Sequence, residues 1–271
     1  MKKNFNESGK SKLKLFFLNL IVLHLLAVAL PALSAPAREF YELKVYQLKN
    51  KEQEDRVDNY LKNAYLPALH RAGISKVGVF KPVSNDTART KKIYVLVPMK
   101  SLDQLTKLPQ TLLKDKQYAQ AGQDYIDAPY TNPPYSRMES IVIQAFELNP
   151  QMGLPNLKGP KAERIYELRS YEGHTEKIYQ NKVQMFNQGG EIDIFKRLGF
   201  NAVFYGEVIA GSRMPNLMYL TTFENRAVRD EKWKSFSSDP AWKTLSGKPE
   251  YKNNVARNET IFMHPADYSD Y

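Results

Sequence analysis

The sequence predicts an α+β protein made of two tandem copies of one β-α-β-β-α-β unit. Three observations support this fold class. Short motifs recur in the same order at offsets of 120 to 126 residues. Strand-like and helix-like segments follow the same succession in both halves, and a segment rich in proline and glycine, 149–161, separates the halves.

The repeat is clearest in the first strand-like segment of each copy. YELKVY at Tyr41–Tyr46 recurs as YELRSY at Tyr166–Tyr171, an offset of 125 residues. Three further pairs keep the order: Leu69–Gly73 with Phe195–Gly199 at 126, Tyr94–Leu96 with Tyr219–Thr221 at 125, and Met138–Ile141 with Asn258–Ile261 at 120. The smaller last offset predicts an insertion in the first copy, which we place at 128–135.

The elements of the first copy follow in order. Residues 39–48 alternate and are rich in Tyr, Leu and Val, which is typical of a strand. Apolar residues at helical spacing predict a helix over 52–72, bent at Pro67 and ended by Gly73. Further strands are predicted at 74–81, 92–98 and 138–147, and one or two short helices, broken at Pro109, over 102–122.

The second copy repeats this order. Its strands are predicted at 163–171, 200–209, 216–223 and 257–264. A helix over 176–198 is interrupted at Gly189-Gly190, and helix over 225–246 is interrupted at Pro240. The order is that of the ferredoxin-like motif, a four-stranded antiparallel sheet with helices on one face. We therefore predict two ferredoxin-like domains, 36–148 and 162–271, whose open faces pair within the chain or across chains in a homo-oligomer.

Residues 1–35 have the pattern of a secretory signal peptide. Lysines precede an apolar run, Leu15–Leu30, and a proline and small residues follow it. The run holds 16 residues, including Asn19 and His24, whereas a membrane span needs roughly 20 apolar residues. We expect cleavage between Ser34 and Ala37 in preference to retention as an anchor. The prediction is an exported protein, periplasmic or secreted, that is not stably inserted in a membrane.

Charge and composition exclude several classes of function. The net charge is +10, of which residues 1–35 carry +4, and the remaining cations are scattered, so no nucleic-acid partner is predicted. The chain has no cysteine, which excludes disulfides, thiol nucleophiles and cysteine metal sites. Nucleophile-elbow and phosphate-loop motifs are absent from the sequence.

Histidine placement does not predict a metal site or a cofactor. After residue 35 the histidines are His70, His174 and His264, and none of them lie at ligand spacing. Haem held by His70 or His174 is left open as an alternative, because an axial ligand requires a pocket and an aimed imidazole. A loop or helix-cap position is the simpler interpretation of both residues.

At this point the motifs resemble the NIPSNAP family. The YEL[KR]xY strand, the stretch Met218–Phe223 and the tract Trp233–Trp242, which reads WxxFxxDPxW, carry the resemblance in the second copy. In the first copy Asp115–Tyr118 is a degenerate version of this tract. The resemblance implies the dimeric α+β barrel type of fold. That superfamily includes cofactor-independent monooxygenases, haem-degrading enzymes, isomerases and stress proteins, so function stays open.

Polar residues of the first strand in each copy are candidate site residues. Alternation groups Tyr41, Leu43 and Val45 on one face, which we expect to meet the helices. The opposite face carries Glu42, Lys44 and Tyr46 in one copy, and Glu167, Arg169 and Tyr171 in the other. We expect this polar set between the paired sheets, either as an ion-pair network or as the lining of a pocket with tyrosine donors and a glutamate base.

The aromatic tract supplies two further candidates, Trp233 and Trp242. They either pack in the core or form the wall of a cleft between helix and sheet, and the second copy is where we look first for a pocket. The predicted function is binding of a small, partly apolar ligand. The alternatives are a cofactor-independent oxygenase or isomerase using Tyr and Glu, and a structural or interaction module.

Overall fold

The computed structural model describes residues 36–271. The predicted signal peptide lies outside the described residues, so cleavage and export stay predictions. In residues 36–271 no helix is long and apolar enough to cross a membrane. Ala37–Tyr271 form one compact unit that contains both repeats.

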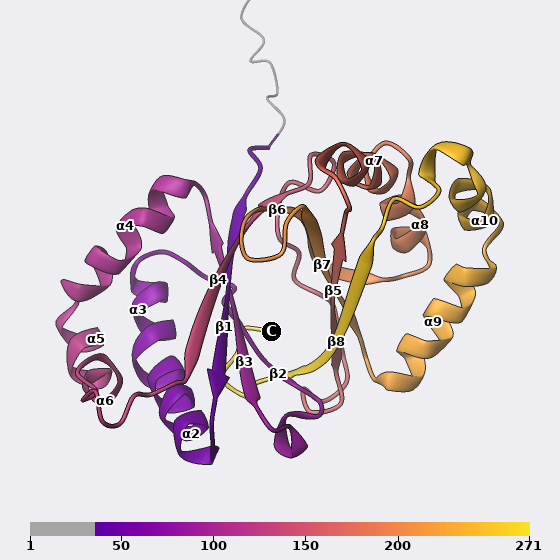
Figure 1. The fold of residues 1–271 in the computed structure, drawn as a ribbon. Helices are drawn as coiled ribbons and strands as arrows, with labels where there is room; N and C mark the ends of the chain where they lie inside the picture. The colour runs from indigo at the N-terminus through magenta and orange to yellow at the C-terminus, as the bar shows by residue number, and fades with distance from the viewer. Residues whose placement is uncertain (1–35) are drawn as a thin grey trace, which may run out of the picture. The chain divides into compact units, whose positions relative to one another are not determined.

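Eight strands of this unit close into a single antiparallel barrel (Figure 1). The strands are β1 (Phe40–Leu48), β2 (Gly78–Pro82), β3 (Lys91–Met99), β4 (Arg137–Ala145), β5 (Ile165–Glu172), β6 (Asn201–Ala210), β7 (Asn216–Phe223) and β8 (Arg257–Pro265). Their order around the barrel is β1-β3-β2-β8-β5-β7-β6-β4. Each repeat thus contributes a sheet ordered fourth-first-third-second strand, which is the ferredoxin-like order, and the predicted fold class is confirmed.

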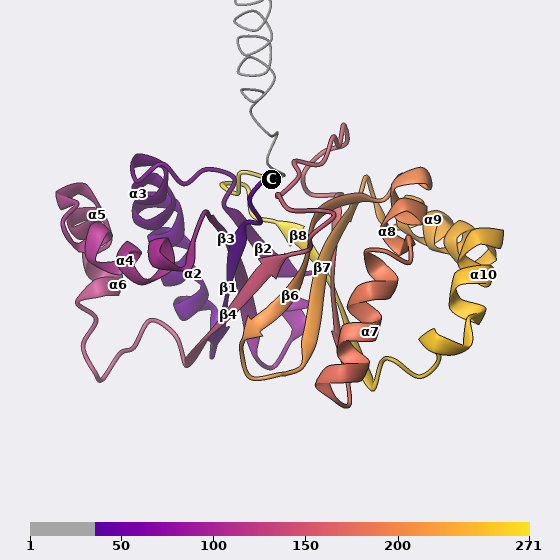
Figure 2. The same ribbon diagram turned by 90° about the horizontal axis from the view of Figure 1, so that it is seen from above.

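The helices form two layers on opposite sides of the barrel (Figures 1 and 2). The first repeat supplies α2 (Lys51–Tyr60), a π-helical segment (Leu61–Tyr65), α3 (Leu66–Arg71), α4 (Leu102–Leu113), α5 (Lys116–Ala121) and α6 (Gln123–Ile126). The second supplies α7 (Glu176–Phe186), α8 (Glu191–Arg197), α9 (Arg226–Ser238) and α10 (Pro240–Gly247). The break at Gly189-Gly190 and the one before Pro240 agree with the sequence prediction.

The repeat extends to individual contacts between helices. Asp115 caps α5 by accepting from the backbone N–H groups of the first turn, and Asp239 caps α10 in the same way. The arginine that ends an earlier helix of the same repeat pairs with each cap: Arg71 of α3 with Asp115 at 2.6 Å, and Arg197 of α8 with Asp239 at 2.8 Å. The arginine and the helix N–H groups hold the pKa of Asp239 below its usual value.

Three apolar cores follow from this arrangement. One fills the barrel interior, with Tyr41, Leu43 and Val45 among its buried residues. The other two lie between the sheets and the two helical layers, and include Tyr46 and Tyr219 respectively. The helices therefore cover the outer faces of the barrel, and the inner faces cover each other.

The predicted grouping of the first strand was right, but its direction was wrong. Tyr41, Leu43 and Val45 face the barrel interior, whereas Glu42, Lys44 and Tyr46 face the helices, and Glu167, Arg169 and Tyr171 do the same in the second repeat. The barrel lumen is surrounded by strands on all sides and takes the apolar set. Between the sheet and the helices, charged side chains have polar partners: the Glu167 carboxylate accepts a hydrogen bond from Trp233 there.

Two smaller predictions were also wrong. Strand register pairs Val45 with Tyr94 and Ser170 with Met218, so Met218 is the counterpart of Tyr94. The sequence comparison paired Tyr94 with Tyr219, which is one residue too far along the second repeat. The two rings therefore lie on opposite faces of their sheets. In addition α4 runs through Pro109 without a break.

Closure at the seam between β4 and β6 depends on Gly206. A Cβ at this position would lie 2.5 Å from Ile143 Cγ2 and 2.7 Å from the Gln144 carbonyl oxygen. We expect Gly206→Ala to lower the free energy of unfolding by about 1–3 kcal/mol. Urea denaturation measures it. Gly247→Ala is the control, since a Cβ there meets nothing within 4 Å; an equal loss in both variants would contradict the account.

Candidate functional site

Glu167 is the centre of an ionic cluster between the second sheet and its helices. Its side chain is fully buried, and its two oxygens accept from Arg169 Nη1 at 2.8 Å and from Arg229 Nε and Nη2 at 2.7 and 2.8 Å. Trp233 Nε1 donates to the same carboxylate at 2.8 Å. The Arg169 guanidinium also lies 4.5 Å from the centre of the Trp233 ring. Two guanidinium groups and one indole N–H thus donate to the Glu167 carboxylate, and both of its oxygens have partners.

The predicted aromatic residues are part of the packing around this cluster. Trp233 contacts Phe195, Phe200 and Phe236, with ring centres 5.2 to 5.8 Å apart. Trp242 packs on Phe236 at 4.4 Å. Both tryptophans are half-buried. They fill the space between helix and sheet.

A second buried pair lies deeper in the same layer. Lys182 Nζ donates to Glu191 Oε2 at 2.8 Å, and both side chains are buried. Burial raises the pKa of Glu191, and Lys182 and Arg169 oppose this effect. Tyr171 lies beside the pair, hydrogen-bonded to the Tyr219 hydroxyl at 2.9 Å. The Tyr171 hydroxyl therefore already has a partner in Tyr219, and its ring packs beside Lys182.

The first repeat has a cavity of about 230 Å³ between its sheet and helices. Glu42 and Lys44 line it from β1, and an apolar wall comes from α4 and the start of α5. The remaining lining residues are Tyr60, Tyr65, Leu105, Leu108, Pro109, Leu112, Leu113 and Tyr118. We call this space the repeat-1 cleft. Among the predicted site residues Glu42 lines it, whereas Tyr46 does not line it and makes edge-to-face contacts with Tyr125 and Tyr135.

The helix caps align the two repeats, and the alignment shows which residues leave the first sheet–helix layer open and fill the second. Ser101 caps α4 and Asn225 caps α9, and the next caps, Asp115 and Asp239, follow 14 residues later in both repeats. Residues in these helices therefore correspond at an offset of 124. Leu105 takes the place of Arg229, and Pro109 takes the place of Trp233. Both replacements are shorter, and both line the cleft.

Glu42 consequently has fewer partners than Glu167. Its Oε1 accepts from Ser140 Oγ at 2.7 Å and lies 3.5 Å from Lys44 Nζ. Its Oε2 has no hydrogen-bond partner among residues 36–271. The carboxylate that lines the cleft therefore keeps an accepting oxygen that is not used by the protein.

The π-helical segment places Tyr65 in the cleft. Such segments insert one extra residue into a helical turn and are frequent at functional sites. Tyr65 is buried, stacks on Tyr60 and has a hydroxyl without a hydrogen-bond partner in the described part of the chain. Burial, and secondarily the Glu42 carboxylate, raise the pKa of Tyr65 well above its usual value. The phenol therefore stays protonated at neutral pH.

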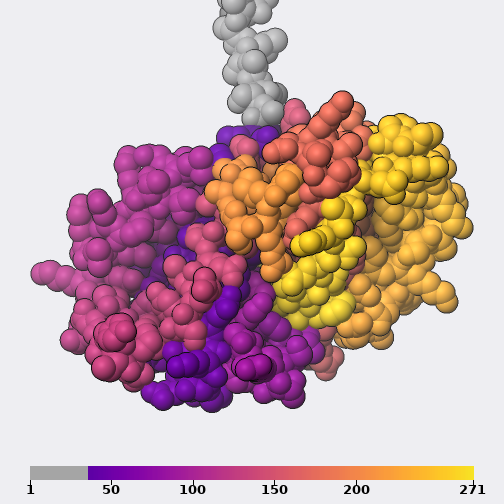
Figure 3. Space-filling view, viewed as in Figure 1, coloured from indigo at the N-terminus to yellow at the C-terminus, as the bar shows by residue number. Residues whose placement is uncertain are grey.

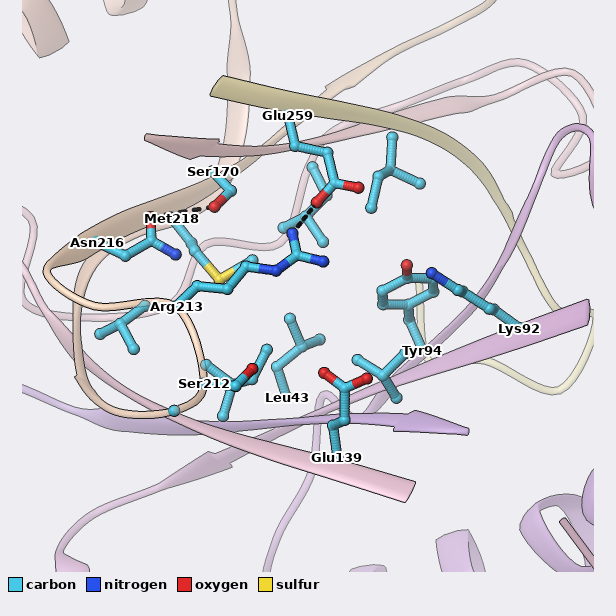
Figure 4. A pocket seen from close by; sticks show the side chains of 16 residues that line it. Leu43, Lys92, Tyr94, Glu139, Ser170, Ser212, Arg213, Asn216, Met218 and Glu259 are labelled. Carbon is cyan, nitrogen blue, oxygen red and sulfur yellow. Dashed lines mark hydrogen bonds and ion pairs between the residues drawn. The ribbon is translucent and has the colours of Figure 1, made fainter. Parts of the chain in front are cut away.

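One end of the barrel interior holds a smaller cavity, of about 40 Å³ (Figure 4). Arg213, from the hairpin between β6 and β7, pairs with Glu259 of β8 across it. Figure 3 shows this hairpin, in orange, beside β8, in yellow. The space is enough for about three waters. It is better described as a small polar space at the end of the core than as a ligand site.

The histidines do not converge. His70 contacts Asp270 at 2.9 Å, His264 Nδ1 lies 2.9 Å from the Arg164 carbonyl oxygen, and His174 is exposed. Over residues 36–271 no group of three or more His, Cys, Asp or Glu side chains could hold a metal ion. His70 and His174 lie outside the repeat-1 cleft.

A comparison with family models identifies the second repeat. Residues 166–270 match the model described as NIPSNAP. This confirms the resemblance predicted from the strand and tryptophan motifs. A search of the curated proteins gives no match.

Solved structures with the same fold span both repeats. A candidate monooxygenase from Lactobacillus acidophilus NCFM matches with a TM-score of 0.55 and 9% identity, covering 84% of this chain and 94% of that one. A candidate monooxygenase from Fusobacterium nucleatum gives 0.56 and 8%, covering 84% and 93%. An anthrone oxidase-like protein gives 0.50 and 10%, covering 86% and 94%. At such identities the likeness establishes the fold alone.

Proposed function

We propose that this chain, whose second repeat is a NIPSNAP domain, binds a small, partly apolar ligand in the repeat-1 cleft. The observation that carries the proposal is the difference between the repeats. The second repeat fills its sheet–helix layer with Trp233 and Arg229, whereas the first leaves a cavity beside an under-used carboxylate. A mostly apolar cavity with a few convergent polar groups is the usual form of a ligand site.

The size and lining define the ligand further. Ligand pockets typically measure about 300–1,000 Å³, so a cavity of 230 Å³ suits a compound of one or two rings. The leucines of α4 contact its apolar body. Glu42 and Lys44 offer an acceptor and a cation to its polar end, and Tyr60, Tyr65 and Tyr118 complete the lining. We also propose, on the leader pattern of residues 1–35, that binding takes place outside the cytoplasm.

The test transplants the filling residues of the second repeat into the first. We expect the double variant Leu105→Arg, Pro109→Trp to lose the binding of one- and two-ring fragments that wild type binds, as measured by ligand-observed NMR. The introduced side chains should occupy the cavity as Arg229 and Trp233 occupy its counterpart. Native mass spectrometry of the purified protein checks in parallel for a co-purifying compound that the variant lacks.

A matched control separates filling from added bulk and charge. Leu102→Arg, Gln110→Trp introduces the same two side chains at exposed positions of α4 that do not line the cleft. Fragments should bind this control as they bind wild type. Unchanged binding in the filled variant would place any ligand elsewhere and refute the proposal.

An enzymatic role is the second candidate, because a carboxylate, a cation and a protonated phenol converge on one cavity. The structural relatives described as candidate monooxygenases and as anthrone oxidase-like are consistent with it. In a cofactor-independent oxygenase or isomerase, Glu42 would accept a proton from the substrate. Glu42→Gln would then abolish turnover, whereas a binding protein would show no turnover to abolish.

A further inference from the structure

The second repeat shows which chemical group its sheet–helix layer accepts beside a glutamate. Trp233 occupies this place, with its ring against phenylalanines and its Nε1–H donated to Glu167 Oε2 at 2.8 Å. Glu167 and Glu42 are the second residues of the YEL[KR]xY motif and correspond in strand register. The protein's own indole is therefore a template for an occupant of the repeat-1 cleft.

The repeat-1 cleft has a hydrogen-bond acceptor and an apolar wall, as the site around Trp233 does, but it has no indole ring. Pro109 replaces Trp233, so the ring volume is missing while the helix backbone continues past it. One oxygen of the corresponding carboxylate, Glu42 Oε2, has no hydrogen-bond partner in residues 36–271. Leu108, Leu112 and Tyr118 supply an apolar and aromatic wall.

Charge favours the same class of ligand. Glu42 is partly compensated by Lys44, whereas Glu167 faces two guanidinium groups. An anionic ligand would meet the Glu42 carboxylate, and a ligand without a donor would leave Oε2 without a partner when it excludes water. A neutral N–H donor meets neither penalty.

From this juxtaposition we infer that the repeat-1 cleft binds a flat aromatic N–H donor, of the indole class, whose N–H donates to Glu42. This inference rests on the proposed function and names its ligand class. The ring lies where Pro109 leaves the space of a tryptophan side chain, and the tyrosines border it from the side of the π-helical segment.

The test uses three probes of nearly one shape: indole, benzofuran and 1-methylindole. Benzofuran replaces the N–H by an oxygen, and 1-methylindole blocks it. A hydrogen bond to a charged acceptor makes indole bind about tenfold or more tightly than benzofuran, by isothermal titration calorimetry on the purified chain. The 1-methyl compound binds more weakly still, because its methyl group meets the carboxylate.

Two variants assign the preference to the cleft. Glu42→Gln reduces the ratio of indole to benzofuran affinity severalfold, since the amide lacks the charge, and its melting temperature shows whether it is folded. Pro109→Trp supplies the ring from the chain itself and abolishes indole binding. Its tryptophan fluorescence reports a newly buried indole.

The outcomes separate the two proposals. Equal affinities for indole and benzofuran, both lost in Leu105→Arg, Pro109→Trp, overturn the ligand class and leave the cleft as the site. Fragment binding in the cleft without binding of any of the three probes also overturns the class alone. Absence of all fragment binding, or binding that the filled variant retains, overturns the proposed function and this inference with it.

Discussion

Glu167→Ala is expected to lower the free energy of unfolding by about 3–5 kcal/mol, because it removes the shared acceptor of a buried ionic cluster. The guanidinium groups of Arg169 and Arg229, with side-chain exposures of 16% and 15%, would then lose the anion that they share, and only Arg229 would keep an ion pair, with Asp230. The Trp233 N–H would lose its acceptor as well. Urea denaturation followed by circular dichroism measures the loss.

The first repeat supplies a matched control for this variant. Glu42→Ala makes the same substitution at the same place in the motif, but the carboxylate there has one hydrogen bond, from Ser140, and one cation at 3.5 Å. We expect a loss of about 1 kcal/mol. Similar losses of unfolding free energy in the two variants would mean that the partners around Glu167 contribute little to stability. The difference between a filled second repeat and an open first repeat would then have little energetic support.

Much of the fold could be predicted because strand and helix signals repeat in order. The offset of 120 at Met138 and Asn258 agrees with the observed registers of β4 on β1 and β8 on β5. The offset of 125 at Tyr94 and Tyr219 disagrees with the observed register, because a tyrosine happens to follow Met218, the true counterpart of Tyr94. The helix caps would have corrected it, since Asp115 and Asp239 lie at 124.

The direction of the strand faces could not be read from alternation. A period of two shows that Tyr41 and Leu43 share a face, but not what covers it. Covering by helices is the rule for a single ferredoxin-like sheet, and it led to the wrong assignment here. Closure of eight strands into a barrel gives the inner face the drier environment, and closure depends on contacts between residues more than 60 positions apart, such as Ala145 with Gly206.

The candidate cleft could have been found by comparing the two copies residue by residue. A tryptophan in the second copy suggested that a pocket would lie there. An aromatic side chain that packs on its neighbours fills space, however, and Pro109 at the corresponding place leaves space. What the sequence could not supply is the π-helical segment, because the letters of Leu61–Tyr65 are ordinary for an α-helix.

Lys182→Met is expected to make stability depend on pH. Glu191 would then be buried without its nearest cation, and its folded-state pKa, already raised by burial, would rise further. A carboxyl whose folded pKa exceeds its unfolded value of about 4.3 contributes fully to stability below that value. The contribution is lost as pH rises through the folded pKa.

At pH 7 we therefore expect Lys182→Met to be less stable than wild type by about 3–5 kcal/mol, which is the cost of leaving one buried charge unpaired. At pH 5 the deficit should be smaller, because the neutral carboxyl is tolerated. Burial keeps the pKa of the neighbouring Tyr171, Tyr205 and Tyr219 above their usual value, so these groups stay neutral between pH 5 and 8.

The second substitution identifies the responsible group. Lys182→Met, Glu191→Gln has no buried charge left at this place, so its stability relative to wild type should recover at pH 7 and change little between pH 5 and 8. Urea midpoints of wild type and both variants across this range measure the effect. A deficit that stays constant with pH in the single variant would show that packing of Lys182 on Phe186, rather than the charge on Glu191, is what the substitution removes.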